Sequence, residues 1–158
     1  MSLAIGAGVW FAATRFTSAE VAPNVAYTLL DGRSTDLAAL RGKVVLVNFW
    51  ATTCTTCVHE MPQIAAMHDK FKERGYDTLA VAMRYDPPAN VIRFAESRQL
   101  PFGVVIDNTG AVARSFGSVE LTPTSVLINK RGEIVSRFVG EPDFAALHLL
   151  VERLLSEG

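Results

Sequence analysis

The sequence contains only two cysteines, Cys54 and Cys57, and both belong to one Cys-x-x-Cys motif. Two cysteines cannot build the disulfide framework of a small secreted scaffold, and they leave a structural zinc site without its second pair of ligands. Covalent haem attachment needs a histidine directly after the second cysteine, and that residue is Val58. The pair is therefore redox-active, metal-binding or an ordinary part of the core.

Clustered basic residues are also absent. Fifteen Lys and Arg residues oppose sixteen Asp and Glu residues, and the basic side chains are scattered apart from short pairs such as Lys130-Arg131. A protein that follows a phosphate backbone needs a basic stripe, so we expect no nucleic-acid partner.

The apolar run at residues 3–13 is too short to cross a bilayer alone, but it matches the length of a signal-sequence core. We interpret residues 1–22 as the remnant of a signal or membrane anchor with a linker. An N-terminal strand or helix packed on the core is the alternative. Residues 23–158 have the composition and length of one globular domain, which we expect to be a monomer.

Within this domain, strand-like and helix-like stretches alternate. Val44 to Trp50 is a continuous apolar run, typical of a central strand buried on both faces. Pro62 is expected to kink the helix that follows, and Gly75 to end it. The pattern predicts an α/β sheet covered by helices on both faces, with strands at 25–30, 44–50, 78–83, 102–106, 124–129 and 134–139, and helices at 54–73, 87–98, 111–116 and 142–155.

The Cys-x-x-Cys motif lies where the buried strand meets the helix. At that junction, free backbone N–H groups and the helix dipole stabilise a thiolate on Cys54, whereas Cys57, inside the first turn, is expected to be buried and less acidic. Thiol-disulfide exchange requires one thiolate that attacks the substrate disulfide and a second sulfur that resolves the mixed disulfide. Two ordinary core cysteines are the alternative.

Peroxidase chemistry is disfavoured because Val47 and Ala51 occupy the positions where peroxiredoxins carry Pro and Thr.

Several motifs occur together and resemble the TlpA/ResA-like branch of the thioredoxin superfamily over residues 25–157. They are the segment Val47–Cys57, Glu60-Met61-Pro62, Thr122–Ile128, Leu30-Asp31-Gly32, Arg41-Gly42-Lys43 and Lys130-Arg131-Gly132-Glu133. The resemblance implies a thioredoxin-like fold, with a central mixed β-sheet and an N-terminal β-hairpin extension. Members of this branch are typically extracytoplasmic and membrane-tethered, and they reduce disulfides of exported proteins, as in cytochrome c maturation.

The resemblance also implies roles for individual residues. Pro123 matches a cis-proline that lies opposite the two cysteines, so that Thr122 presents its backbone to the substrate; a trans proline that only begins a strand is the alternative. Glu60 matches an acidic residue near the active site and lies one helical turn beyond Cys57. A buried carboxyl there would have a raised pKa and could exchange protons with the resolving thiol, whereas a solvent-facing Glu would not. Asn48 occupies the position of the buried Asp of classical thioredoxins.

Two further residues are assigned to the substrate-binding set. Thr53 stands where most relatives have Trp, which makes the apolar wall beside the thiolate smaller. Trp50, at the end of the strand, is expected to pack beside the site.

The expected function is a thiol-disulfide oxidoreductase that reduces disulfides of client proteins, with a membrane thiol reductase as electron donor. The reductive direction comes from the family and from Thr55 and Thr56, since strongly oxidising relatives often carry His between the cysteines. We assign no metal ligand and expect no cofactor other than the redox-active disulfide. A copper chaperone on the same fold and a redox-inactive adaptor are the alternatives.

Overall fold

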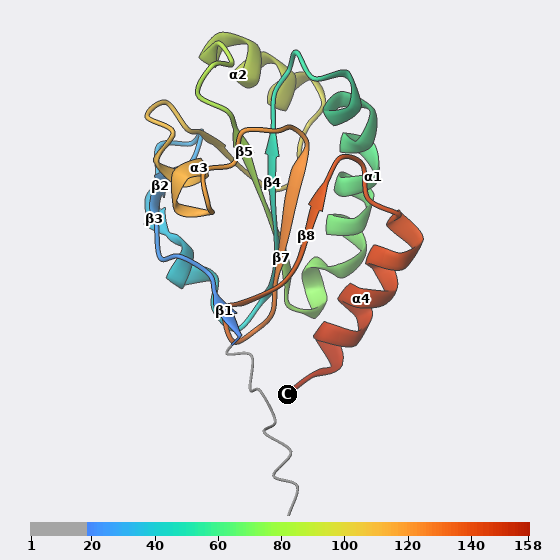
Figure 1. The fold of residues 1–158 in the computed structure, drawn as a ribbon. Helices are drawn as coiled ribbons and strands as arrows, with labels where there is room; N and C mark the ends of the chain where they lie inside the picture. The colour runs from blue at the N-terminus through green and yellow to red at the C-terminus, as the bar shows by residue number, and fades with distance from the viewer. Residues whose placement is uncertain (1–18) are drawn as a thin grey trace, which may run out of the picture.

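The computed structural model describes residues 19–158 (Figure 1). The apolar run at 3–13 lies outside the described residues. The strands are β1 (Glu20–Val21), β2 (Ala26–Thr28), β3 (Ser34–Asp36), β4 (Val44–Trp50), β5 (Tyr76–Ala82), β6 (Gly103–Ile106), β7 (Thr124–Ile128) and β8 (Glu133–Val139). The α-helices are α1 (Thr55–Phe71), α2 (Pro88–Ser97), α3 (Ala111–Ser115) and α4 (Phe144–Ser156), and the short 3-10 helices are η1 (Leu37–Leu40) and η2 (Lys72–Arg74).

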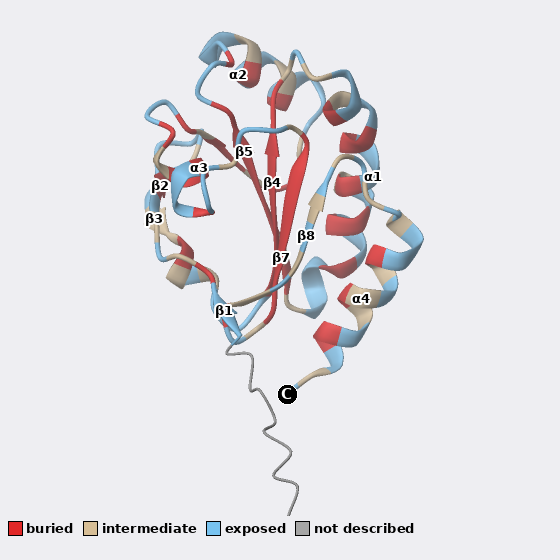
Figure 2. Ribbon diagram, in the orientation of Figure 1, coloured by how far each residue is buried: buried red, intermediate tan, exposed pale blue. Residues whose placement is uncertain are grey.

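Six strands form one mixed sheet in the order β1-β8-β7-β4-β5-β6. Strand β4 is parallel to β5 and β5 to β6, whereas β4 with β7, β7 with β8 and β8 with β1 are antiparallel. Every residue of β4 is buried, as its continuous apolar sequence predicts (Figure 2). The carboxyl ends of β4 and β5 lie at the same edge of the sheet, where the two cysteines follow.

Helices cover both faces of the sheet (Figure 1). Helices α1, α2 and α4 bury apolar side chains in one core layer, through residues such as Ile64, Val91 and Val151. On the other face, α3 and η1 pack with the β2–β3 hairpin in a second layer, where the rings of Phe49 and Phe116 are 5.5 Å apart between their centroids. Burial of each such side chain contributes about 1.5–3 kcal/mol, so the two layers hold β4 from both sides. The predicted fold class is confirmed.

The N-terminal hairpin extension is present as a separate two-stranded sheet, β2 with β3. Its turn contains Gly32 with a φ of 86°, a conformation that glycine adopts without strain. The hairpin joins the main sheet because Leu29 forms a bridge with Val105 and the Leu30 N–H donates to the Val104 carbonyl. Strand β2 is shorter than the predicted 25–30, since the chain turns at Leu30 and Asp31.

Strand β1 was not predicted. Glu20 pairs with Ile134 of β8, and Ala22 is buried, so the folded part of the chain includes residues before the predicted boundary at 23. Two residues are too few to show a strand period, and only pairing with β8 defines this strand.

Helix α1 begins directly after Cys54 and continues past Pro62 to Phe71. The single turn of η2 follows, and Gly75, with a φ of 90°, ends the segment as predicted. No helix among residues 19–158 is long and apolar enough to span a membrane.

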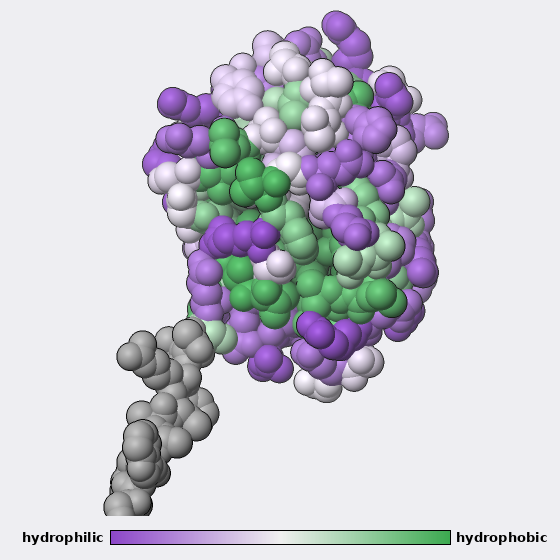
Figure 3. All heavy atoms as spheres, turned by 45° about the vertical axis from the view of Figure 1, so that its right-hand side comes forward, coloured by the Kyte–Doolittle hydropathy of each residue, from purple (hydrophilic) through white to green (hydrophobic). Residues whose placement is uncertain are grey.

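The side of the molecule that carries α4 shows apolar side chains gathered between polar ones (Figure 3). Exposed large apolar residues of β8 and α4 are Val135, Val139 and Leu149. Exposed apolar residues are common on protein surfaces, and we assign these three no role.

Helix α4 begins at Phe144, two residues later than the predicted start at Pro142. Asp143 is the N-cap, and its carboxylate accepts a hydrogen bond of 3.1 Å from the Ala146 N–H. The helix begins after Asp143 because its side chain satisfies one of the free N–H groups of the first turn, which Pro142 has no side-chain acceptor to do.

Replacing Asp143 with Ala should lower the free energy of unfolding by about 1 kcal/mol, because the capping hydrogen bond is lost. Asp143→Asn is the matched control, since an Asn side chain also caps. Urea unfolding followed by circular dichroism measures both variants, and equal stability of Asp143→Ala and the unchanged protein would contradict this role.

Candidate active site

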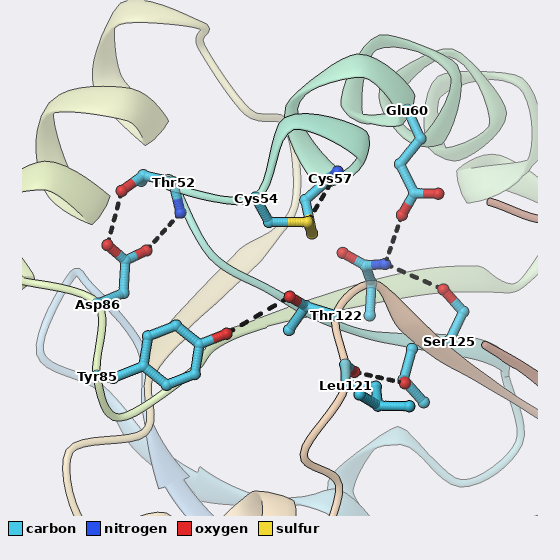
Figure 4. Close-up of a disulfide and its surroundings, with 11 residues drawn as sticks. Thr52, Cys54, Cys57, Glu60, Tyr85, Asp86, Leu121, Thr122 and Ser125 are labelled. Carbon is cyan, nitrogen blue, oxygen red and sulfur yellow. Dashed lines mark hydrogen bonds between the residues drawn. A yellow bond between two sulfur atoms is a disulfide. The ribbon is translucent and has the colours of Figure 1, made fainter. Parts of the chain in front are cut away.

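The Cys54–Cys57 disulfide lies at the end of β4 and in the first turn of α1 (Figure 4). The two Cα atoms are 5.2 Å apart. Cys54 is partly exposed and is the N-cap of α1, where its sulfur accepts a hydrogen bond of 3.2 Å from the Cys57 N–H. Cys57 is completely buried. The predicted placement of Cys54 at the strand–helix junction and the predicted burial of Cys57 are confirmed, and the helix N-terminus favours a thiolate on Cys54.

A buried acid stands one turn behind the disulfide. Glu60 has no exposed surface, and its carboxyl accepts a hydrogen bond of 3.1 Å from the side-chain amide of Asn48 in β4. Burial raises the pKa of Glu60 from its usual 4.5 to about 7; the Asn48 hydrogen bond opposes this shift, and the charge of Glu141 adds to it. The prediction of a buried carboxyl with a raised pKa is confirmed, and the alternative of a solvent-facing Glu is wrong.

Asn48 and Ser125 complete this buried group, and the sequence analysis gave them no role. The same Asn48 amide donates a second hydrogen bond, 3.0 Å long, to the hydroxyl of Ser125 in β7. A polar residue inside the apolar run of β4 is a sequence signal, because a buried amide needs partners. Its partners come from α1 and β7, and only the folded chain identifies them. One oxygen of Glu60 and the Asn48 carbonyl oxygen have no hydrogen-bond partner among the described residues.

The loop before β7 borders the disulfide from another direction. The Thr122–Pro123 peptide bond is cis, as the resemblance implies. Pro123 is buried and its carbonyl accepts a hydrogen bond from the Gly140 N–H, whereas Thr122 is partly exposed. In Figure 4, Thr122 lies between the Tyr85 ring and the two sulfurs. A contact of Thr122 and Pro123 with substrate remains a prediction.

A third loop, which follows β5, borders the site. The buried carboxylate of Asp86 accepts two hydrogen bonds of 2.6 Å from Thr52, one from its N–H and one from its hydroxyl. The neighbouring Tyr85 is exposed, and its phenol lies 3.4 Å from the Thr122 hydroxyl (Figure 4). The sequence analysis missed Thr52, Tyr85 and Asp86. Their signal was positional, since they follow two parallel strands whose carboxyl ends meet at one edge of the sheet.

Two residues of the predicted substrate-binding set differ in exposure. Thr53 is exposed directly before Cys54. Trp50 has no exposed surface, and its ring centroid lies 5.1 Å from that of Phe94 in α2. Trp50 therefore packs beside the site, as expected, but offers no surface to a substrate, which corrects its place in the substrate-binding set.

Each of the three histidines contacts a group other than the two cysteines in the described part of the chain. His59 approaches the Glu141 carboxylate at 3.3 Å, His68 is buried against the Thr78 hydroxyl, and His148 packs on the ring of Phe71. Residues 19–158 contain no group of three or more His, Cys, Asp or Glu side chains placed to hold a metal ion.

The fold and the site place this chain in the thioredoxin-fold class of redox proteins. The features that define the class are a mixed sheet with helices on both faces, an N-terminal hairpin and a disulfide at the N-terminus of α1. Within that class, the chain belongs to the Redoxin family, which matches residues 17–147. It is 37% identical over 120 residues to the thiol-disulfide oxidoreductase ResA of Bacillus thuringiensis, with 76% of this chain and 68% of the relative covered. For ResA of Halalkalibacterium halodurans the identity is 38% over 121 residues, with 77% and 68% covered.

Solved structures agree with this assignment. The solution structure of a Neisseria meningitidis protein proposed to be a thioredoxin is 40% identical, with a TM-score of 0.80 and coverage of 86% of this chain and 90% of that one. A thioredoxin-family thiol:disulfide interchange protein from Chlorobium tepidum is 26% identical, with a TM-score of 0.80 and coverage of 87% and 97%. The chain is a TlpA/ResA-like thiol-disulfide oxidoreductase.

The raised pKa of Glu60 predicts a pH-dependent stability. The pKa of Glu60 in the folded chain exceeds its value in the unfolded chain. The protonated carboxyl therefore makes its full contribution to the free energy of unfolding below about pH 4.5, and this contribution is lost as the pH rises through about 7. Relative to Glu60→Gln, the unchanged protein should lose roughly 3 kcal/mol of unfolding free energy over this range. Denaturant unfolding of both proteins in the disulfide form, at pH 4.5 and pH 8, measures the difference. A constant difference would show that Glu60 does not titrate there.

Proposed function

We propose that this oxidoreductase reduces disulfides of exported client proteins outside the cytoplasm. The observation that carries the proposal is the placement of a buried carboxyl, Glu60, one helical turn behind the buried Cys57, while Cys54 is open to a partner. This arrangement separates the sulfur that meets the client from the sulfur that resolves, and it gives the resolving thiol a base whose pKa lies near neutrality.

In the reductive cycle, the Cys54 thiolate attacks one sulfur of the client disulfide, and the second client sulfur leaves as a thiolate that takes up a proton. Glu60 accepts the proton of the Cys57 thiol, and the Cys57 thiolate then attacks the Cys54 sulfur. This step releases the first client sulfur and forms the Cys54–Cys57 disulfide. Two electrons have passed from the protein dithiol to the client, and a membrane thiol reductase supplies two electrons to restore the dithiol.

The charges around the sulfurs support the reducing direction. A strong oxidant needs a reduced form whose thiolate is highly stabilised, commonly by a positive group next to the sulfur. Thr55 and Thr56 are neutral, and an ionised Glu60 disfavours negative charge on a nearby thiolate. Both features weaken the reduced form and make it a better electron donor.

We assign client contact to the exposed Thr53 and to Thr122 and Pro123, which border the disulfide. The ResA relatives and the N-terminal apolar run support an extracytoplasmic location with a signal or anchor at residues 1–22, and cytochrome c maturation is the expected setting. We propose that the protein acts as a monomer, with the disulfide as its only redox centre.

The activity is tested by insulin reduction with dithiothreitol as electron source. The unchanged protein should turn over, Cys54→Ser should fall to the uncatalysed rate, and Cys57→Ala should accumulate mixed disulfides with the client, because it attacks but cannot resolve.

Copper(I) titration of the same samples separates the enzyme from the alternatives. Turnover without tight copper binding supports the oxidoreductase. Stoichiometric copper binding without turnover would make the protein a copper chaperone, and a Cys54→Ser variant that retains the cellular phenotype would make it an adaptor.

The role of Glu60 predicts a changed pH profile. Glu60→Gln keeps the hydrogen-bond acceptor for Asn48 but cannot take a proton, so client reduction at pH 7 should slow by about 10²-fold. The rate of the resolving step, measured by stopped flow, should also no longer change with pH around 7. If both proteins show the same profile, Glu60 is only structural.

A further inference from the structure

A pocket of about 430 Å³ opens beside the third active-site loop, between the end of β5, helix α3 and the segment that leads to the cis-proline. None of the functional roles described above involves it. The residues that line it include Met83, Arg84, Tyr85, Arg114 and Glu120.

Two arginines converge in this pocket over a glycine. A Cβ atom built on Gly110 would lie 3.1 Å from a terminal nitrogen of Arg114 and 3.3 Å from the Cδ of Arg84, so both side chains pass close to the same bare backbone position. The Arg114 guanidinium donates a hydrogen bond of 2.7 Å to the Thr109 carbonyl, which fixes one side of its planar group. Within residues 19–158 the guanidinium makes no other hydrogen bond, so its remaining N–H groups can donate to a ligand.

The pocket carries excess positive charge. Within residues 19–158, neither Arg84 nor Arg114 forms an ion pair, and Glu120 is the only acidic side chain in the pocket lining. The nearby carboxylates are already engaged: Asp86 accepts from Thr52, and Asp107 accepts from two N–H groups at the start of α3. A carboxylate bound in this pocket could accept charge-assisted hydrogen bonds from both arginines, because a guanidinium pairs with a carboxylate through two parallel N–H groups.

Tyr85 connects this pocket to the site of sulfur exchange. Its side chain lines the pocket, and its phenol reaches the Thr122 hydroxyl, next to the disulfide (Figure 4). Asp86, the next residue, ties the same loop to Thr52, two positions before Cys54. A polypeptide segment whose cysteine is joined to Cys54 therefore has the pocket within reach of its neighbouring side chains.

We propose that this pocket binds the carboxylate of an Asp or Glu side chain that lies close in sequence to the reacting cysteine of a client, and that Arg84 and Arg114 thereby set a preference for acidic disulfide segments. The inference rests on the proposed function, because it concerns the same client during the same exchange.

The test uses the reduced protein and synthetic peptides with one internal disulfide. Each peptide carries Glu at one position within four residues of a cysteine, and its twin carries Gln there. At one or more positions the unchanged protein should reduce the Glu peptide about tenfold faster in kcat/KM than the Gln peptide. In Arg84→Gln/Arg114→Gln this ratio should fall to about one, and in the unchanged protein it should decline as salt screens the charges.

Arg93→Gln/Arg153→Gln is the matched control, since it removes the same charge from exposed arginines of α2 and α4 outside the pocket. It should keep the preference for Glu. Equal rates for both peptides at every position, or a preference that survives Arg84→Gln/Arg114→Gln, would overturn the inference while leaving the proposed function intact. A protein that reduces neither peptide would contradict both.

Discussion

The passage from a fully buried strand to a helix, at Cys54, is the constraint on which the rest of the structure depends. Strand β4 is buried along its whole length between two core layers, so it cannot shift without disturbing both. Helix α1 must therefore begin at a fixed place, and Cys54 becomes its N-cap. The same geometry that exposes Cys54 to a partner draws Cys57 into the core, and the unequal environments of the two sulfurs follow from it.

Three loops meet at the edge of the sheet that this junction defines. The segment before α1 is fixed by the buried Asp86 carboxylate from the loop after β5, through two short hydrogen bonds to Thr52. The loop before β7 joins them through the contact of Thr122 with Tyr85. The surface beside the disulfide is thus formed by segments far apart in sequence. The pocket that contains Arg84 and Arg114 extends this surface toward α3.

The polar group behind Cys57 shows how the fold supports the chemistry. A buried carboxyl destabilises the folded state when it is ionised, and here the hydrogen bond from Asn48 offsets only part of that effect, so the pKa of Glu60 stays near 7. A group that exchanges its proton near neutral pH suits a base for a thiol. Asn48 also donates a hydrogen bond to Ser125 of β7, so residues of two central strands hold the carboxyl of Glu60 in place.

The sequence by itself determined most strands of the sheet, most of its helices and the positions of the two sulfurs, and the family resemblance added the mixed sheet, the cis-proline at 123 and the acid behind Cys57. The strands, helices and sulfurs rest on local patterns, such as the apolar run of β4 and the spacing of Cys54 and Cys57 at the start of one helix. Only the tertiary structure decided the pairing of β1 with β8, the partners of Asn48, the burial of Trp50, and the approach of Asp86 to Thr52 and of Arg84 to Arg114. Each of these joins residues that the chain brings together from separate strands, helices and loops, and such contacts leave no periodic trace in the sequence, since packing rather than local preference selects them.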